Sequence, residues 1–228
     1  MPPDFVNMFL PDGFRHALAG EHISLTIRGG GLGESFARCP NCSRPLHRIF
    51  TVPSEIVASL TGRSWNESVD MLFCWQCRAA EKLIYQSSGE GLRFIDWQTG
   101  TEGYPIWEGY PDAFPKFEIP LAPQLDIEKE VMMMLYEHND HGVNLAPEVL
   151  AKLPGDVIRP RHQVGGFPYL EELPPPRACP ICGHAMKIFA TGSNFNGTQS
   201  GFCDYDFVVM VFAMCFDCFV THAFHQVD

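Results

Sequence analysis

The amino-acid sequence predicts an α+β protein that is predominantly antiparallel β-sheet, with an internal duplication and a four-cysteine, zinc-ribbon-like site in each half. Three observations support this fold class. Four Cys-x-x-Cys pairs recur at matched distances, short β-branched and aromatic runs flank these pairs, and few segments have helical periodicity. The chain has 228 residues, 46% of them hydrophobic, so it is long and apolar enough to bury a sizeable core.

The duplication follows from the spacing of the cysteine pairs. The first and third pairs lie 140 positions apart, and the second and fourth lie 141 apart. Their flanks also agree, because "ARCPNCSRPLHRIF" and "RACPICGHAMKIFA" share Cys-Pro-x-Cys followed by a long apolar residue, and a glycine cluster precedes each. Chance rarely produces four pairs with matched offsets. We therefore predict a first pseudo-repeat over 1–97, an acidic connecting segment over 98–158 and a second pseudo-repeat over 159–228.

Local patterns predict the strands. "HRIFTV" and "MKIFAT" leave the first pair of each half, and "VDMLF" and "FVVMVFAM" lead into the second pair. The segment "KLIYQSSGEGLRFIDW" at 82–97 has two apolar runs around Ser-Gly-Glu-Gly, which predicts a β-hairpin. These runs give each half a strand, a cysteine turn and a strand.

Helices are expected at three places. "PSEIVASL" has Ser54 as the predicted N-cap, and "DIEKEVMMMLYEHND" has Asp126 as N-cap with acidic residues in its first turn. "APEVLAKL" follows, with Pro147 suited to the first helical position and Pro154-Gly155 as a stop.

Between the halves, residues 102–123 are rich in proline and aromatic residues. We expect an extended segment that covers an edge of the core, with a peptide-binding surface as the alternative. A second long loop is expected at 191–206, where glycine, serine and asparagine accumulate. The aromatic residues of the first segment are Tyr104, Trp107, Tyr110, Phe114 and Phe117.

The formal net charge of −11 is unevenly distributed. Residues 98–158 carry three Lys and Arg against 11 Asp and Glu, which accounts for −8 of the total. Such a charge disfavours nucleic acid and favours a basic partner, although it also serves solubility. The N-terminus lacks a signal-peptide pattern, and no apolar run is long enough for a membrane span. We expect a cytoplasmic protein with no membrane partner.

The cysteine pairs predict two structural Zn²⁺ ions. Two Cys-x-x-Cys turns provide four thiolates for a tetrahedral ion. The pairs are separated by 31 residues in the first half and 32 in the second. Doubling a loop costs only about 0.6 kcal/mol in closure entropy, whereas structural zinc contributes roughly 10–16 kcal/mol in small peptides. The predicted ligands are Cys39, Cys42, Cys74 and Cys77 for one ion, and Cys179, Cys182, Cys215 and Cys218 for the other.

Other uses of these cysteines fit the sequence less well. A thiol-disulfide enzyme needs its cysteine at a helix N-terminus after a strand, but Pro45 and Gly183 follow the first pairs and the runs downstream resemble strands. A catalytic zinc needs an open coordination position, which four thiolates do not leave. We find no phosphate loop, nucleophile elbow or carboxylate pair, and so predict no enzyme activity. Ligand exchange between the halves stays open, although the spacing favours sets within each half.

Several residues near the cysteines have candidate roles. Basic neighbours are expected to offset the formal charge of about −2 on each zinc site, and they also provide the basis for a nucleic-acid-binding alternative. Cys203 is expected to be a small buried apolar residue. The pairs His138/His141 and His222/His225 have i,i+3 spacing without a third ligand, so helix-end or surface positions are expected. The basic neighbours are Arg38, Arg44, His47 and Arg48 in the first half, and Arg177, His184 and Lys187 in the second.

The order "HQVGGFPYLEE", "CPICGHAMKIFA" and "FVVMVFAMCFDC" resembles the YwqG-like family of uncharacterised bacterial proteins. More distantly, it is similar to the programmed cell death protein 2 family. The match covers residues 162–225, and the repeat over 28–85 extends it. The resemblance implies a duplicated, β-rich intracellular fold, and the eukaryotic relatives act as dedicated chaperones of a basic ribosomal protein.

Together these observations predict a zinc-stabilised intracellular protein-binding module, chaperone-like for a basic client. Two alternatives belong to other classes. A nucleic-acid-binding zinc ribbon protein would bind RNA or DNA in a salt-sensitive manner. A CxxC thiol oxidoreductase would be free of metal and would have titratable dithiols.

Overall fold

The computed structural model describes residues 6–18, 20–31, 37–77, 82–88, 91–97, 113–138, 146–153, 161–170, 172–193 and 208–227. Within these ranges the protein is mostly antiparallel β-sheet with few helices, as the sequence predicts. Several predictions fall outside the described residues: those for Cys203 and His141, for the aromatic residues Tyr104, Trp107 and Tyr110, and for the helix stop at Pro154-Gly155.

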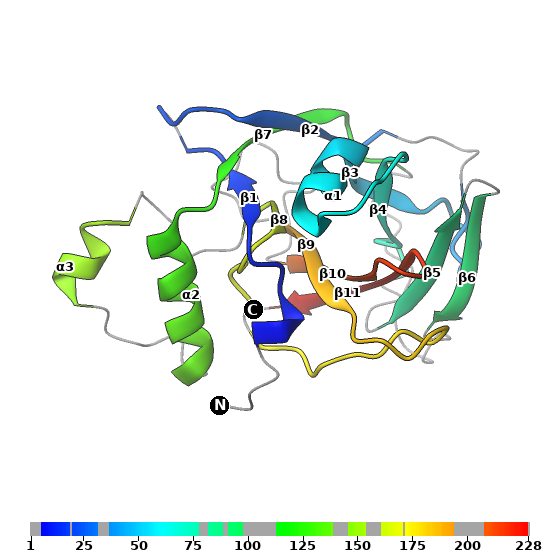
Figure 1. The fold of residues 1–228 in the computed structure, drawn as a ribbon. Coiled ribbons are helices and arrows are strands. Elements are labelled where there is room, and N and C mark those ends of the chain that lie inside the picture. Colours follow the sequence, from blue (N-terminus) through cyan, green and yellow to red (C-terminus); the bar gives the residue numbers. More distant parts are fainter. Residues whose placement is uncertain are drawn as a thin grey trace.

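One sheet holds eleven strands of the described chain, in the order β4-β3-β2-β7-β1-β8-β9-β10-β11-β5-β6. Strands from all three predicted segments therefore share one sheet (Figure 1). The strands are β1 (Gly13–His16), β2 (Leu25–Gly29), β3 (His47–Val52), β4 (Val69–Phe73), β5 (Leu83–Ser88), β6 (Gly91–Trp97), β7 (Phe117–Pro123), β8 (Gln163–Gly165), β9 (Lys187–Ser193), β10 (Val208–Cys215) and β11 (Val220–Val227).

The helices begin close to the predicted positions, but their caps differ. In α1 (Ser54–Thr61) Ser54 is the first helical residue, and Pro53 occupies the N-cap without a side-chain cap. In α2 (Asp126–His138) Asp126 is likewise helical, and Glu128 Oε2 accepts a hydrogen bond from the backbone N–H of Leu125 at 2.6 Å. This is the reciprocal half of a capping box. The remaining helices are η1 (Val6–Met8) and α3 (Pro147–Leu150), which begins at Pro147 as predicted.

The segment expected to be an extended cover contributes a central strand instead. β7 lies between β2 and β1, although it contains Pro120 and ends at Pro123. Proline removes a backbone donor and argues against a central strand, which explains why sequence patterns miss β7. Phe114 lies just before the strand and is buried in the main core, as expected for the aromatic residues of this segment.

The sheet curls so that its β4 edge approaches β5 and β11. Tyr85 on β5 accepts a hydrogen bond at its hydroxyl from the backbone N–H of Leu72 and donates to the carbonyl of Asp70, at 2.9 and 3.2 Å. Both partners belong to β4, so one buried phenol satisfies two backbone groups of an otherwise open edge. Burial raises the pKa of Tyr85, which therefore remains a neutral donor at physiological pH.

The curled sheet has a core on each face. The larger core includes residues from β3, β4, β5, β9 and β10 together with α1. A second core joins α2 and η1 to Ile188, Val211 and Phe224 of β9, β10 and β11. Figure 1 shows α2 and α3 on the side of the molecule opposite the β5–β6 hairpin.

Two antiparallel strand pairs of the sheet have the same register. In β3–β4, His47 pairs with Phe73, and in β9–β10, Lys187 pairs with Met214. Each strand pair has one irregularity, which skips Ile49 in β3 and Phe189 in β9. These two residues lie 140 positions apart in the sequence.

The glycine turns before the cysteine pairs also correspond. Gly30 and Gly165 have positive φ angles of 64° and 69°. A Cβ on Gly30 would lie 1.9 Å from the carbonyl oxygen of Pro115, and one on Gly165 would lie 2.5 Å from that of Asp12. Both positions therefore need glycine, because a side chain would collide with the backbone just before β7 or β1.

Candidate metal centres

The structure brings the eight predicted ligands together in two clusters. Within each cluster the sulfur atoms lie within 4.8 Å of one another. Each set comes from one half of the sequence, which answers the question of ligand exchange between halves in favour of separate sets. One cluster contains Cys39, Cys42, Cys74 and Cys77, and the other contains Cys179, Cys182, Cys215 and Cys218.

The first turn of each cluster has the same backbone geometry. The N–H of Cys39 donates to the carbonyl of Arg44 at 2.8 Å, and the N–H of Ser43 donates back to the carbonyl of Cys39 at 2.9 Å. In the second half, Cys179 donates to His184 at 2.7 Å and Gly183 donates to Cys179 at 2.9 Å. These are the same two bonds 140 positions later, and they fold a Cys-Pro-x-Cys segment into a tight reversal.

Both turns require a residue in the left-handed region after their second cysteine. Ser43 has a φ of 61° and Gly183 a φ of 76°. Glycine meets this requirement without strain, whereas serine tolerates it at some cost. The conformation is thus imposed by the turn, since two different residue types adopt it.

The second turns of the clusters follow the ends of β4 and β10. Cys74 comes directly after Phe73, the last residue of β4, and Cys215 is the last residue of β10. In the first cluster the N–H of Trp75 donates to His47 Nδ1 at 3.2 Å. His47 is fully buried, so this bond fixes its tautomer and anchors the second turn to β3.

The donor sets fit a tetrahedral zinc ion. Zn–S bonds of about 2.3 Å place the four sulfurs about 3.8 Å apart. The Sγ–Sγ distances are 3.5 Å for Cys39–Cys77 and for Cys42–Cys74. In the second cluster Cys182 and Cys215 are 3.6 Å apart. A disulfide requires about 2.05 Å, so these cysteines are arranged around a common centre and are not joined in pairs.

The four cysteines of the first cluster shift one another's pKa values in different directions. Hydrogen bonds with the other three sulfurs, and then burial, raise the pKa of Cys74. Hydrogen bonds from Cys39 and Cys74 lower the pKa of Cys42 to about 7. Four adjacent thiolates repel one another in a buried site, so a divalent cation is the natural partner that lets all of them ionise.

The second cluster is similar in geometry but more exposed. A hydrogen bond from the backbone of His184 is the largest cause that lowers the pKa of Cys182. Hydrogen bonding with Cys182 is the largest cause that raises the pKa of Cys218, to about 12. Cys179 and Cys215 are buried, whereas Cys182 is exposed and Cys218 is half-buried.

Two of the basic neighbours have partners other than the cysteines. Arg48 donates to the carbonyl oxygens of Gly30 and Gly31, which fixes the glycine turn. In the other half, Arg177 lies over the ring of Phe224 at 5.2 Å. The expectation that basic side chains gather around the thiolates is therefore wrong for these two. Arg38 does contact the first turn, through a hydrogen bond to the carbonyl of Ser43 at 3.0 Å.

A polar link joins the two halves beside the second cluster. Asp217, inside the Cys215–Cys218 turn, accepts from Arg63 at 2.5 Å and contacts His184 Nδ1 at 2.8 Å. The hydrogen bonds from His184 and then Arg63 lower the pKa of Asp217. The sequence gives no signal for this contact, because Arg63 lies 154 positions from its partner.

The histidine pairs do not form metal sites in the described part of the chain. His138 ends α2, as expected for a helix-end residue. His222 lies on β11 and is fully buried, so the expectation of a surface position is wrong for it. Residues three apart on a strand face opposite sides of the sheet, which prevents His222 and His225 from sharing an ion.

Comparisons with protein-family models, with curated proteins and with solved structures find no match to this chain. The resemblance to the YwqG-like family stays a prediction. Among the described residues, no helix is long and apolar enough to cross a membrane. Fold and site thus define an antiparallel β protein with two four-cysteine clusters suited to metal binding.

Proposed function

We propose that this chain is a zinc-stabilised protein-binding module of the cytoplasm, in which each cluster holds one structural Zn²⁺. The observation that carries the proposal is the convergence of eight cysteines into two sets at near-tetrahedral distances. When bound, the ion would cross-link two turns that otherwise hold only a few hydrogen bonds. The chain's own turns orient the sulfurs, and its backbone N–H groups stabilise the thiolates.

We further propose that the two halves arose by internal duplication. Support comes from the matched first turns, the shared register of the β3–β4 and β9–β10 strand pairs, and the equivalent irregularities at Ile49 and Phe189. The strands on the other side of β3 and β9 also correspond, because Gly29 of β2 pairs with Phe50 of β3, and Val164 of β8 pairs with Ala190 of β9. The halves differ after the second turn, where β11 returns to β10 but β5 pairs with β11.

A structural role suits the donor sets better than a catalytic or redox role. Four sulfur ligands fill a zinc ion and leave no position for water. Redox pairs need a helix N-terminus at the reactive cysteine. Here the first pairs lead into the strands β3 and β9, and the last pair leads into β11. The function is therefore sought on the surfaces that the clusters hold in place.

The partner we propose is a basic protein. The net charge of −11 attracts cationic surfaces and repels nucleic-acid phosphates. A chaperone-like role for a basic client is the specific form of this proposal. A nucleic-acid-binding ribbon is the second candidate, and the small basic group of Arg38 and Arg44 at the first cysteine turn is what favours it.

Affinity capture at graded ionic strength tests the proposal. The purified holoprotein is immobilised and offered a cell extract, and bound proteins and nucleic acids are quantified between 50 and 500 mM salt. We expect a small set of basic proteins whose capture falls with salt. Chelator-treated protein is the control, because loss of the metal should remove the binding surface. Enrichment of nucleic acid, or no basic protein above background, would contradict the proposal.

A further inference from the structure

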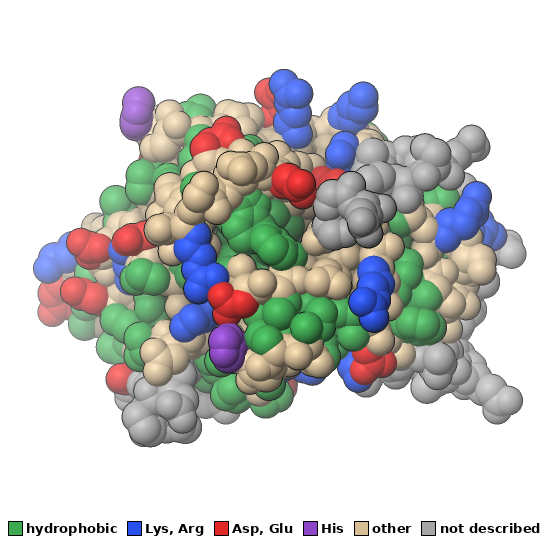
Figure 2. All heavy atoms as spheres, turned by 45° about the vertical axis from the view of Figure 1, so that its right-hand side comes forward, with side chains coloured by type: hydrophobic (Ala, Val, Ile, Leu, Met, Phe, Trp, Pro, Cys, Tyr) green, Lys and Arg blue, Asp and Glu red, His purple; other side chains and the backbone are tan. Residues whose placement is uncertain are grey.

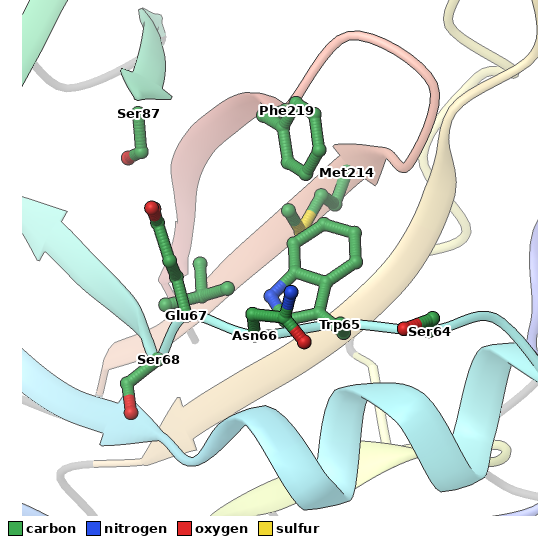
Figure 3. A pocket seen from close by; sticks show the side chains of 9 residues that line it. Ser64, Trp65, Asn66, Glu67, Ser68, Ser87, Met214 and Phe219 are labelled. Atoms are coloured by element: carbon green, nitrogen blue, oxygen red, sulfur yellow. The ribbon is translucent and has the colours of Figure 1, made fainter. Parts of the chain in front are cut away.

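A cavity of about 340 Å³ opens between the two halves of the chain. Its walls come from the connection between α1 and β4, from the end of β10, from β5 and from the turn that completes the second cluster. Figure 3 shows these side chains, and Figure 2 shows a face where hydrophobic side chains gather between separate charged groups. The lining residues are Ser64, Trp65, Asn66, Glu67, Ser68, Val69, Ser87, Met214 and Phe219.

Aromatic rings form one side of this cavity. The rings of Trp65 and Phe219 lie 4.6 Å apart at 54°, and Phe216 contacts Trp65 edge-on at 6.2 Å. Phe219 remains 43% exposed, which makes it one of the few large hydrophobic residues exposed in the described chain. In Figure 3 the Phe219 ring lies above that of Trp65 in the view, and the Met214 side chain lies beside both.

Phe219 holds a backbone conformation that a bulky residue rarely adopts. Its φ is 57°, in the left-handed region, at the position that follows the second cysteine of a turn. The equivalent place after Cys182 is occupied by Gly183, with a φ of 76°. An aromatic residue costs roughly 1–2 kcal/mol there. Strained residues concentrate at functional sites, so a phenylalanine in this conformation makes its surroundings a candidate site.

Among the described residues that line the cavity, one is charged, and it is acidic. Glu67 extends along the wall toward Ser87, and the other polar lining groups are hydroxyls and an amide. The nearest basic neighbour in sequence, Arg63, is engaged by Asp217 at 2.5 Å. The described part of the lining therefore presents a carboxylate beside aromatic faces and contains no Lys, Arg or His.

We propose that this cavity binds a cationic side chain with an aliphatic stem, a lysine or arginine of the basic partner, and this inference rests on the proposed function. The stem lies against Met214 and Trp65. The charged end faces the aromatic rings, where cation–π attraction applies, and forms an ion pair with Glu67. The cavity volume lies at the lower end of ligand sites, which suits one side chain better than a folded domain.

A peptide series tests the ligand class directly. The probes are the blocked tripeptide acetyl-Gly-Lys-Gly-amide and its arginine, norleucine and glutamate counterparts. Binding to the holoprotein is followed by the NMR signal of the Trp65 indole N–H, assigned by its loss in Trp65→Phe. We expect saturable shifts with lysine and arginine, and at least about tenfold weaker binding with norleucine, because the charge supplies cation–π and ion-pair attraction. The glutamate peptide should not bind.

Two variants separate binding from folding. Glu67→Gln changes an exposed side chain and should weaken the lysine peptide about 3- to 10-fold while leaving norleucine unchanged. Phe219→Gly should weaken it at least as much but keep the thermal midpoint close to wild type, because relief of the left-handed backbone offsets the lost ring contact. Ile23→Ala is the matched control, since Ile23 is also an exposed hydrophobic residue but does not line the cavity.

The outcomes distinguish this inference from the proposed function. Equal binding of norleucine and lysine, or no shift at Trp65, would overturn the cationic pocket. If basic proteins are still captured by Phe219→Gly with unchanged affinity, the pocket is wrong while the proposed function stands. If the peptides bind as expected but no basic protein is captured, the proposed function is overturned and the pocket stands.

Discussion

The two cysteine clusters share their turn geometry but not their surroundings. In the first cluster Cys74 has no exposed surface, Cys39 has 1%, and the site belongs to the main hydrophobic core. The second cluster belongs to a small core with Ile84, Met186 and Val220, and Cys182 is exposed. Equivalent sequence motifs therefore occupy different depths, so the same four-cysteine motif can contribute differently to stability.

The covering residues account for this difference. The Phe114 ring lies 4.7 Å from that of His47, tilted by 40°, and meets Trp75 edge-on at 5.9 Å, so it packs against the second turn of the first cluster. The second cluster is instead held by β5, whose Gln86 donates to the carbonyl of Cys218 at 2.8 Å. We infer that the first cluster stabilises the main hydrophobic core, whereas the second supports a surface to which both halves contribute.

The largest effect is expected from Cys74→Ser. This change removes a buried ligand of the first cluster and leaves three thiols in the core. Structural zinc contributes roughly 10–16 kcal/mol in small peptides, and a domain is stable by about 5–15 kcal/mol, so the cooperative fold should be lost. Circular dichroism and zinc content measure this. A cooperative thermal transition with wild-type midpoint would contradict the central position of the first cluster.

Cys182→Ser should have a smaller effect, because the ligand is exposed and its cluster lies in a minor core. We expect one zinc ion to be lost or weakly held, with a cooperative transition that shifts down by roughly 5 °C. The comparison between Cys74→Ser and Cys182→Ser is the test: equal losses of structure would show that depth does not matter.

Phe114→Ala should make the first cluster behave like the second. Removing a buried phenylalanine costs about 3–5 kcal/mol. Zinc release to a chromogenic chelator should also become faster at the first cluster, because solvent reaches the thiolates. Ile23→Ala serves as the control. Unchanged release kinetics, despite the lower thermal midpoint, would indicate that Phe114 packs the core without shielding the metal.

The smallest effect is expected from Arg63→Ala. The Arg63–Asp217 pair is exposed, and such pairs contribute little to stability, so the midpoint should change by no more than about 2 °C. Zinc release from the second cluster should nevertheless accelerate, since Asp217 lies within its turn. Faster zinc release from the first cluster instead would contradict the proposed role of the Arg63–Asp217 pair in the second cluster.

The sequence predicts those parts of the fold that depend on local patterns. The strands β3 and β4, the hairpin β5–β6 and the ligand sets follow from short apolar runs and from cysteine spacing. Parts that depend on distant contacts escape it. β7 contains prolines, yet it is a central strand because it pairs with β1 on one side and with β2 on the other. Ser54 and Asp126 are residue types typical of N-caps, but each is the first residue of its helix instead.

The same limit applies to the candidate sites. Arg15 on β1 lies 2.7 Å from Glu128 on α2, with both side chains buried, and their separation of 113 positions hides the pair from sequence patterns. The cavity at Trp65 and Phe219 likewise combines residues from both halves. A bulky residue directly after a Cys-x-x-Cys turn, where Gly183 stands in the other turn of that cluster, is the one sequence signal that points to it.

Metal content with thiol counting, on protein purified without chelator, tests the central claim most directly. We predict two zinc ions per chain by elemental analysis. Under native conditions we expect one reactive thiol, or none if Cys203 is buried, and nine thiols after denaturation with chelator. Protein free of zinc, with its cysteines paired as disulfides, would contradict the account.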